Sequence, residues 1–267
     1  MIDFVRDLPA AQLAALVCLS FVGFTWLGII TLRPLFRWFV RAEPDINGVV
    51  GNFVSIYGVF YGILMGLLAV AAYQNKADVM QAIAAEGTSI YAVFRSAGSF
   101  PDATRVPMQA SIREYVQFVI EKEWPSMRKG ELPRGGMPLI NQLQGQIAAF
   151  EPATPGQQIA LAETTRQFYN FLEHRAVRLY SVTTGIPGIM WYVVLLGAVI
   201  SIFFVWLFDM TRRAQFFLGG LMSFFISAMI SLIVVLDSPL RGEFGLSPEV
   251  FELLLGFMNK VLGGPAG

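Results

Sequence analysis

Residues 55–68 read SIYGVFYGILMGLL, and this stretch decides the fold class of the protein. It carries no charge and lies within a longer charge-free run from Ile46 to Asn75. Three more such runs, Leu8–Leu32, Leu179–Phe208 and Ala214–Leu236, are each at least 23 residues long. In a helix, about 20 apolar residues cross the hydrocarbon core of a bilayer. The sequence therefore predicts an all-α, polytopic membrane protein with four transmembrane helices.

The composition of the whole chain supports this class. Of 267 residues, 55% are hydrophobic and 14% are charged. Asp3 and Asp7 precede the first apolar run, which is also longer than the hydrophobic part of a secretory signal peptide. We expect this run to be retained as a helix. The single cysteine, Cys18, lies inside it, so no disulfide framework is possible within one chain.

The four spans leave one large charged region in the middle of the chain. It holds 21 of the 38 charged residues, 11 basic and 10 acidic. We expect a helical soluble bundle here, inserted between spans two and three and continuous with both. The predicted segments are transmembrane helices at 8–32, 48–72, 188–208 and 214–236, the soluble region at 73–187 and a C-terminal amphipathic helix at 247–262.

Within the soluble region, apolar side chains recur at helical spacing. Met108, Ile112, Tyr115 and Val119 share one face of a predicted amphipathic helix. Because proline lacks an N–H group, Pro125 is expected to end this helix. The sequence places the carboxylates of Glu121 and Glu123 on its solvated face.

Two later helices have recognisable starts. Thr154 and Pro155 are suited to the N-cap and first position of one helix, and Ser247 and Pro248 to those of the C-terminal helix. The expected buried face of the first consists of Ile159, Phe168, Leu172, Leu179 and Val182. We expect that helix to break or kink at GIPG, residues 185–188, before span three. The C-terminal helix is expected to lie in the membrane interface or against the bundle.

The short loops predict an orientation. Arg33, Arg37 and Arg41 follow span one, and Arg212 and Arg213 lie between spans three and four. Arginine-rich short loops face the cytoplasm. This rule places the soluble bundle and both termini on the outer side of the membrane.

Two stripes of small residues predict close helix packing. Their members recur every four residues and therefore share one side of a helix. The stripe in span two contains Gly58, Gly62 and Gly66, and the stripe in span four contains Ser223, Ser227 and Ser231. Small residues let helix backbones approach closely in a membrane. We expect both stripes to face other helices, with mutual contact as one option.

Several segments resemble the bestrophin-like family of bacterial membrane proteins, which is distantly grouped with the bestrophin anion channels. The matching segments include TGIPGIMWYVVLLGAVISI (184–202), EWP (123–125) and LDSPLRGEFGLSPE (236–249). The resemblance implies four spans around a helical region, in a bacterial inner membrane. Bestrophins keep that region in the cytosol, so the resemblance and the arginine distribution disagree on which side of the membrane the helical region lies.

The resemblance also implies a pore. In bestrophins the hydrophobic neck lies on the second span, so we expect Phe53, Phe60 and Leu64 to be pore-lining. The alternative is that these side chains face lipid or the core of the subunit.

The remaining polar candidates have structural interpretations, with an ion-attracting vestibule as the alternative for Glu86 and Arg95 and a gating or ion-binding role as the alternative for Asp237. Glu86 and Arg95 lie nine residues apart on the extended second helix, so each is expected to meet another helix rather than pair directly. Asp237, at the end of span four, is expected to cap and anchor it, with Arg241 one turn further on.

The sequence contains no pattern typical of an enzyme. His174 is the only histidine, and no second histidine or cysteine is placed to share a metal ion. We expect no catalytic residues, no metal and no cofactor. With zero net charge and no basic tract, a nucleic-acid partner is not expected either.

Two functions stay open. One is a homo-oligomeric ion channel, by resemblance an anion channel, in which span two faces the pore. The other is a structural or regulatory membrane subunit that docks a different membrane protein complex through its helical bundle and transports nothing. In both cases the lipid bilayer is the surrounding partner.

Overall fold

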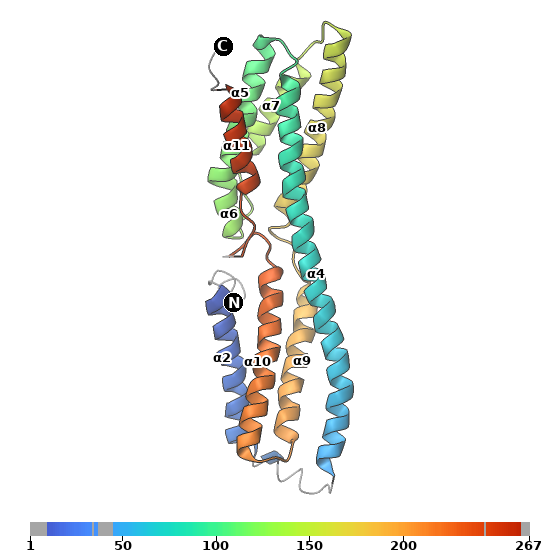
Figure 1. The fold of residues 1–267 in the computed structure, drawn as a ribbon, viewed down its shortest axis with the longest axis vertical. Helices are drawn as coiled ribbons and strands as arrows, with labels where there is room; N and C mark the ends of the chain where they lie inside the picture. The colour runs from blue at the N-terminus through green and yellow to red at the C-terminus, as the bar shows by residue number, and fades with distance from the viewer. Residues whose placement is uncertain (1–9, 34, 37–44, 243, 263–267) are drawn as a thin grey trace. The chain divides into compact units, whose positions relative to one another are not determined.

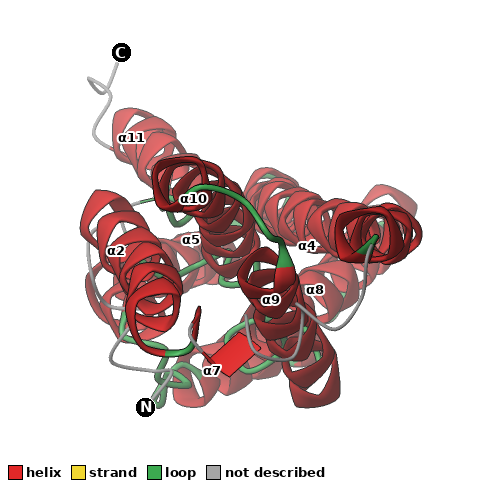
Figure 2. Ribbon diagram, turned by 90° about the horizontal axis from the view of Figure 1, so that it is seen from below, coloured by secondary structure: helices red, strands yellow, loops and turns green. Residues whose placement is uncertain are grey.

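The computed structural model describes residues 10–33, 35, 36, 45–242 and 244–262. All regular structure in these ranges is helical (Figure 2). The helices are α2 (Ala10–Thr31), α4 (Ile46–Ala97), α5 (Asp102–Phe118), the π-helical turn η1 (Val119–Glu123), α6 (Trp124–Arg128), α7 (Met137–Ala148), α8 (Pro155–Tyr180), α9 (Gly188–Leu207), α10 (Arg212–Leu236) and α11 (Glu249–Leu262) (Figure 1).

The chain divides into two compact units. Unit 1 comprises Met1–Asn75 and Gly185–Ser238, and unit 2 comprises Lys76–Thr184 and Pro239–Gly267. Helix α4 contributes to both, because its 52 residues contain no proline and run without interruption. Between α8 and α9 the helix is broken. Pro187, just before α9, has no N–H to continue a helical ladder.

Unit 1 contains the four helices that are long and apolar enough to cross a membrane: α2, the first part of α4, α9 and α10. They lie side by side in Figures 1 and 2. The described part of the first predicted span begins at residue 10, so positions 8 and 9 lie outside it. Four helices of this kind fit a multi-pass membrane protein.

Polar side chains join α2 to α10 and α9. The hydroxyls of Thr25 and Ser223 lie 2.5 Å apart, and Ser227 Oγ donates to Cys18 Sγ at 3.1 Å. The indole of Trp206 donates to the Thr25 carbonyl and packs directly over Gly28, where a Cβ would overlap the ring. Such bonds and close approaches, rather than apolarity alone, select helix partners in lipid.

Unit 2 has its own apolar core, built from the second part of α4 together with α5, η1, α6, α7, α8 and α11. Its largest fully buried side chains include Trp124, Tyr115, Phe168 and Phe251. Helix α11 packs against this core: Phe251 is fully buried, and a Cβ at Gly87 of α4 would lie 2.6 Å from Val250. Thr154 caps α8 by accepting a hydrogen bond from the Gln157 amide, which confirms the expected start of that helix.

Two sequence expectations are wrong here. Pro125 does not end the helix, because the chain stays helical to Arg128. The π turn before it explains why: the Trp124 amide donates to the Val119 carbonyl, five residues back, and the wider turn accommodates a residue that would clash in a regular α-helix. Ile159 is exposed, because it lies off the buried face of α8, which consists of Thr164, Phe168, Phe171, Arg175 and Arg178.

Replacing Phe251 by alanine should detach α11 from unit 2. The ring is fully buried, so we expect the free energy of unfolding to fall by about 3 to 5 kcal/mol. Leu253→Ala is the matched control, because Leu253 lies on the same helix and is exposed. Unfolding in detergent, followed by circular dichroism, measures both. Equal stability of the two variants would contradict this packing.

Candidate functional site

The first candidate site is the outer face of α4 in unit 1. Phe53 and Phe60 are 63% and 70% exposed. Leu64, the third residue expected to line a pore, is only half-exposed and packs against the core of unit 1. The structure therefore places two of the three candidates on one open face and the third at its edge.

Helix α4 is the least covered of the four long apolar helices. Other parts of the chain bury 11% of its most apolar window, against 22% for α2, 33% for α9 and 39% for α10. The open face is a continuous stripe of large apolar side chains: Val49, Phe53, Ile56, Phe60, Ile63, Leu67 and Val70. Such a surface is suited to lipid or to a protein partner within the membrane.

The glycine stripe lies on a different side of α4. Among the described residues, nothing comes within 4 Å of a Cβ built on Gly58, Gly62 or Gly66. These glycines line an open apolar groove of about 280 Å³ between α4 and α10, together with Val54, Tyr57, Tyr61, Met65, Ser201, Met222, Phe225, Ile226 and Met229. The serine stripe of α10 does not face them, since Ser223 and Ser227 contact α2.

Two tyrosines attach α4 to α9. The hydroxyl of Tyr57 donates to the Gly197 carbonyl, and that of Tyr61 donates to the Val194 carbonyl at 3.1 Å. The ring of Tyr61 lies so close to Gly197 that a side chain there would overlap it. These contacts fix the rotation of α4 about its axis, and so determine which residues its open face presents.

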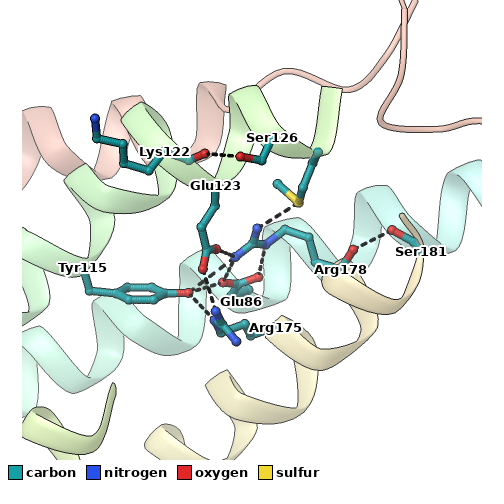
Figure 3. Close-up of polar contacts among 9 residues, drawn as sticks. Glu86, Tyr115, Lys122, Glu123, Ser126, Arg175, Arg178 and Ser181 are labelled. Carbon is teal, nitrogen blue, oxygen red and sulfur yellow. Dashed lines mark hydrogen bonds and ion pairs between the residues drawn. The ribbon is translucent and has the colours of Figure 1, made fainter. Parts of the chain in front are cut away.

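The second candidate site is a buried charge network in unit 2 (Figure 3). Arg178 of α8 is fully buried and binds two carboxylates. Its Nε and Nη2 donate to Glu86 of α4 at 2.7 and 2.9 Å, and Nη2 also donates to Glu123 of η1 at 2.7 Å. The guanidinium further lies 5.8 Å from the ring centre of Trp124 and 5.6 Å from that of Phe251.

Arg175 and Tyr115 complete this network. Arg175 Nη2 donates to Glu123 at 2.5 Å, and the Tyr115 hydroxyl donates to Glu86 at 2.8 Å. Burial raises the pKa of the Tyr115 hydroxyl well above its usual range, and the charge of Glu86 raises it further. Two guanidinium groups thus face two carboxylates around a neutral phenol.

The arginines stay charged in this setting. Burial of Arg178 disfavours its charged form, but the adjacent Glu86 and Glu123 outweigh that effect and raise its pKa well above the usual range. The same balance raises the pKa of Arg175. The network can therefore join α4, α5, η1 and α8 electrostatically without leaving a net charge in the core.

Comparison with known proteins identifies the family. A bestrophin-like domain matches residues 19–251, which include all four long apolar helices except the start of α2. The chain belongs to the bestrophin-like family. No curated protein and no solved structure gives a significant match.

Sequence reasoning missed most of the charged network of this bestrophin-like protein. Of its four charged residues, only Glu86 was singled out. Glu123 was placed on a solvated face, whereas it is fully buried, and no role was expected for Arg175 or Arg178. The missed signal is the spacing of Tyr115, Val119, Glu123 and Met127, all buried and four apart. Twelve residues over three turns correspond to four residues per turn, which is more than the α-helical value of about 3.6 and indicates a π turn.

The other polar candidates lie apart from the network. Arg95 is exposed near the end of α4. Asp237 is buried at the end of α10 and accepts a hydrogen bond from the Ile186 amide at 2.5 Å, while Arg241 donates to the Gly130 carbonyl at 3.0 Å. In the part of the chain that the structure describes, no group of three histidine, cysteine, aspartate or glutamate residues is placed to hold a metal ion.

Glu123→Ala should destabilise unit 2 strongly. It leaves Arg175 without its carboxylate and Arg178 with one of two, and removing one partner of a buried pair costs about 3 to 5 kcal/mol. Glu121→Ala is the control, because Glu121 lies in the same turn and is exposed. Thermal unfolding in detergent distinguishes them. If both variants melt like the parent protein, the network does not hold unit 2 together.

Proposed function

We propose that this bestrophin-like protein is a homo-oligomeric ion channel in which the open face of α4 lines the pore. One observation carries the proposal: α4 is the least covered of the four long apolar helices, and its open face bears Phe53 and Phe60. A helix that lines a shared axis must be accessible in the single chain. The family relationship adds the precedent of channels with an apolar neck on the second span.

The gating mechanism follows from the side chains of this face. Rings of Phe53 and Phe60 around an axis would form an apolar constriction, from which water withdraws when the passage is narrow. A dewetted constriction blocks ions without any plug. Widening or shortening it restores a continuous water path and permits conduction.

The proposal includes the placement of unit 2. Most of the charged residues lie in unit 2, which suits a region outside the bilayer, and its segment Lys76–Thr184 is the helical bundle inserted between spans two and three. We place it on the outer side of a bacterial inner membrane, by the arginine rule. Of the arginines in the first loop, Arg33 donates to the Met210 carbonyl, while Arg37 and Arg41 lie outside the described residues.

The proposal is tested by ion flux in liposomes. Liposomes that contain the purified protein should lose an imposed chloride gradient. Chloride is the first ion to test because of the relationship to anion channels. Phe60→Ala should increase the flux several-fold, since a smaller side chain lowers the barrier to wetting.

Val59→Ala provides the matched control for this flux experiment. Val59 neighbours Phe60 and is also exposed, but it lies about 100° around the helix. Its flux should equal that of the parent protein. Liposomes that stay tight to both anions and cations would contradict a channel and favour a subunit that docks another membrane protein complex.

A further inference from the structure

The groove between α4 and α10 has one smooth wall and one wall of large side chains. Along Gly58, Gly62 and Gly66, no described atom comes within 4 Å of a Cβ placed at these positions, so this wall consists of helix backbone. The opposite wall is formed by α10 side chains that include Met222 and Met229. The groove therefore continues along α4 without side chains of α4 dividing it.

The depth of the groove in the membrane decides what can reach it. Its α4 wall, residues 54–66, lies in the middle of the charge-free run 46–75. Its α10 wall, residues 222–229, lies in the middle of the run 214–236. Because both runs are long enough to cross the hydrocarbon core, the groove lies near the centre of that core. Lipid tails and other membrane-spanning helices are the components found at this depth.

The groove is too small for a helix. Its α4 wall is about 18 Å long, and a helical segment of that length and about 10 Å diameter occupies about 1,400 Å³. The groove holds about 280 Å³. One side chain of a neighbouring helix would fill a single turn of it and leave the other turns open. An acyl chain is thin and unbranched, and it lies along the bilayer normal, as membrane-spanning helices such as α4 and α10 do (Figure 1).

The polar groups of the lining already have hydrogen-bond partners. The hydroxyls of Tyr57 and Tyr61 donate to carbonyls of α9, and Ser201 Oγ donates to another α9 carbonyl oxygen at 3.0 Å. A polar ligand would lose its hydrogen bonds to water here without replacing them. Three lining residues are methionines, whose flexible side chains adapt to an irregular apolar chain. The chemistry of the lining thus favours a hydrocarbon ligand.

We infer that this groove binds one acyl chain of a bilayer phospholipid. The tail joins α4 to α10, as Tyr57 and Tyr61 join α4 to α9. Its methylene groups make the dispersion contacts with the glycine backbone that no side chain of the described residues makes. The inference goes beyond the proposed channel. It requires that the chain spans a bilayer, but neither ion conduction nor several copies.

Photolabelling from within the bilayer tests this site. The full chain is reconstituted in liposomes that contain a phosphatidylcholine with a diazirine in the middle of one acyl chain, and the labelled residues are mapped by mass spectrometry. Met222 and Met229 should be labelled several-fold more than Leu221 and Phe224. These two residues are the internal control, because they lie at the same depth of α10 and are exposed outside the groove.

Gly62→Leu supplies a second measurement. The new side chain would occupy the groove, so labelling of Met222 and Met229 should fall to the level of Leu221. Gly51→Leu is the matched control, because Gly51 is equally open on the same helix but does not line the groove. Its labelling should equal that of the parent protein. If Gly62→Leu does not fold, the labelling ratio in the parent protein decides alone.

The results that contradict this inference are independent of ion flux. Equal labelling of groove and control residues would show ordinary contact with the bilayer only. Labelling of Leu221 and Phe224 without the groove would show that a protein segment covers it. Unchanged labelling in Gly62→Leu would place the reactive tail elsewhere. Preferential labelling that Gly62→Leu abolishes supports the bound tail, even if the liposomes conduct no ions.

Discussion

A bilayer removes the usual reason for helices to pack. Lipid tails are as apolar as leucine, so burying an apolar face in protein gains little over leaving it in lipid. Shape and hydrogen bonds then decide which faces meet. Thr25 with Ser223, Trp206 over Gly28, and Tyr57 with Gly197 are contacts of this kind in unit 1. These contacts hold α2, α9 and α10 together and attach one side of α4 to α9. The rest of α4 stays uncovered.

Unit 2 is held by a different balance. Its apolar core surrounds two arginines and two glutamates, and the charges are tolerated because each guanidinium meets a carboxylate. The π turn is part of this solution. It places Glu123, Trp124 and Met127 inside, where a regular α-helix would bring Lys122 and Ser126 toward the core. Arg178 contacts all three of these buried side chains.

The sequence predicts the four long apolar helices well, because charge-free runs of this length are typical of membrane-spanning helices. Helix caps such as Thr154 can also be predicted from the sequence, because they depend only on neighbouring residues. The errors arise where long-range contacts override local patterns. The local pattern places Glu123 in solvent, but two arginines of α8 bind it in the core. The pattern also predicts that Pro125 ends the helix, but a π turn accommodates the proline. The glycine stripe shows a further limit, because small residues predict close packing without saying what packs. Phe53 and Phe60 could be chosen through the resemblance, but the Tyr57 and Tyr61 contacts that orient them join residues more than 130 positions apart.

The central claim is that α4 faces a shared axis, and the symmetry of the assembled particle tests it most directly. Electron microscopy of the purified protein in a membrane mimetic gives both the number of copies and the helix nearest the centre. The account predicts a closed ring of more than two copies with α4 innermost and Phe53 and Phe60 at the axis. A monomer, a dimer, or a ring with α2, α9 or α10 at its centre would contradict it.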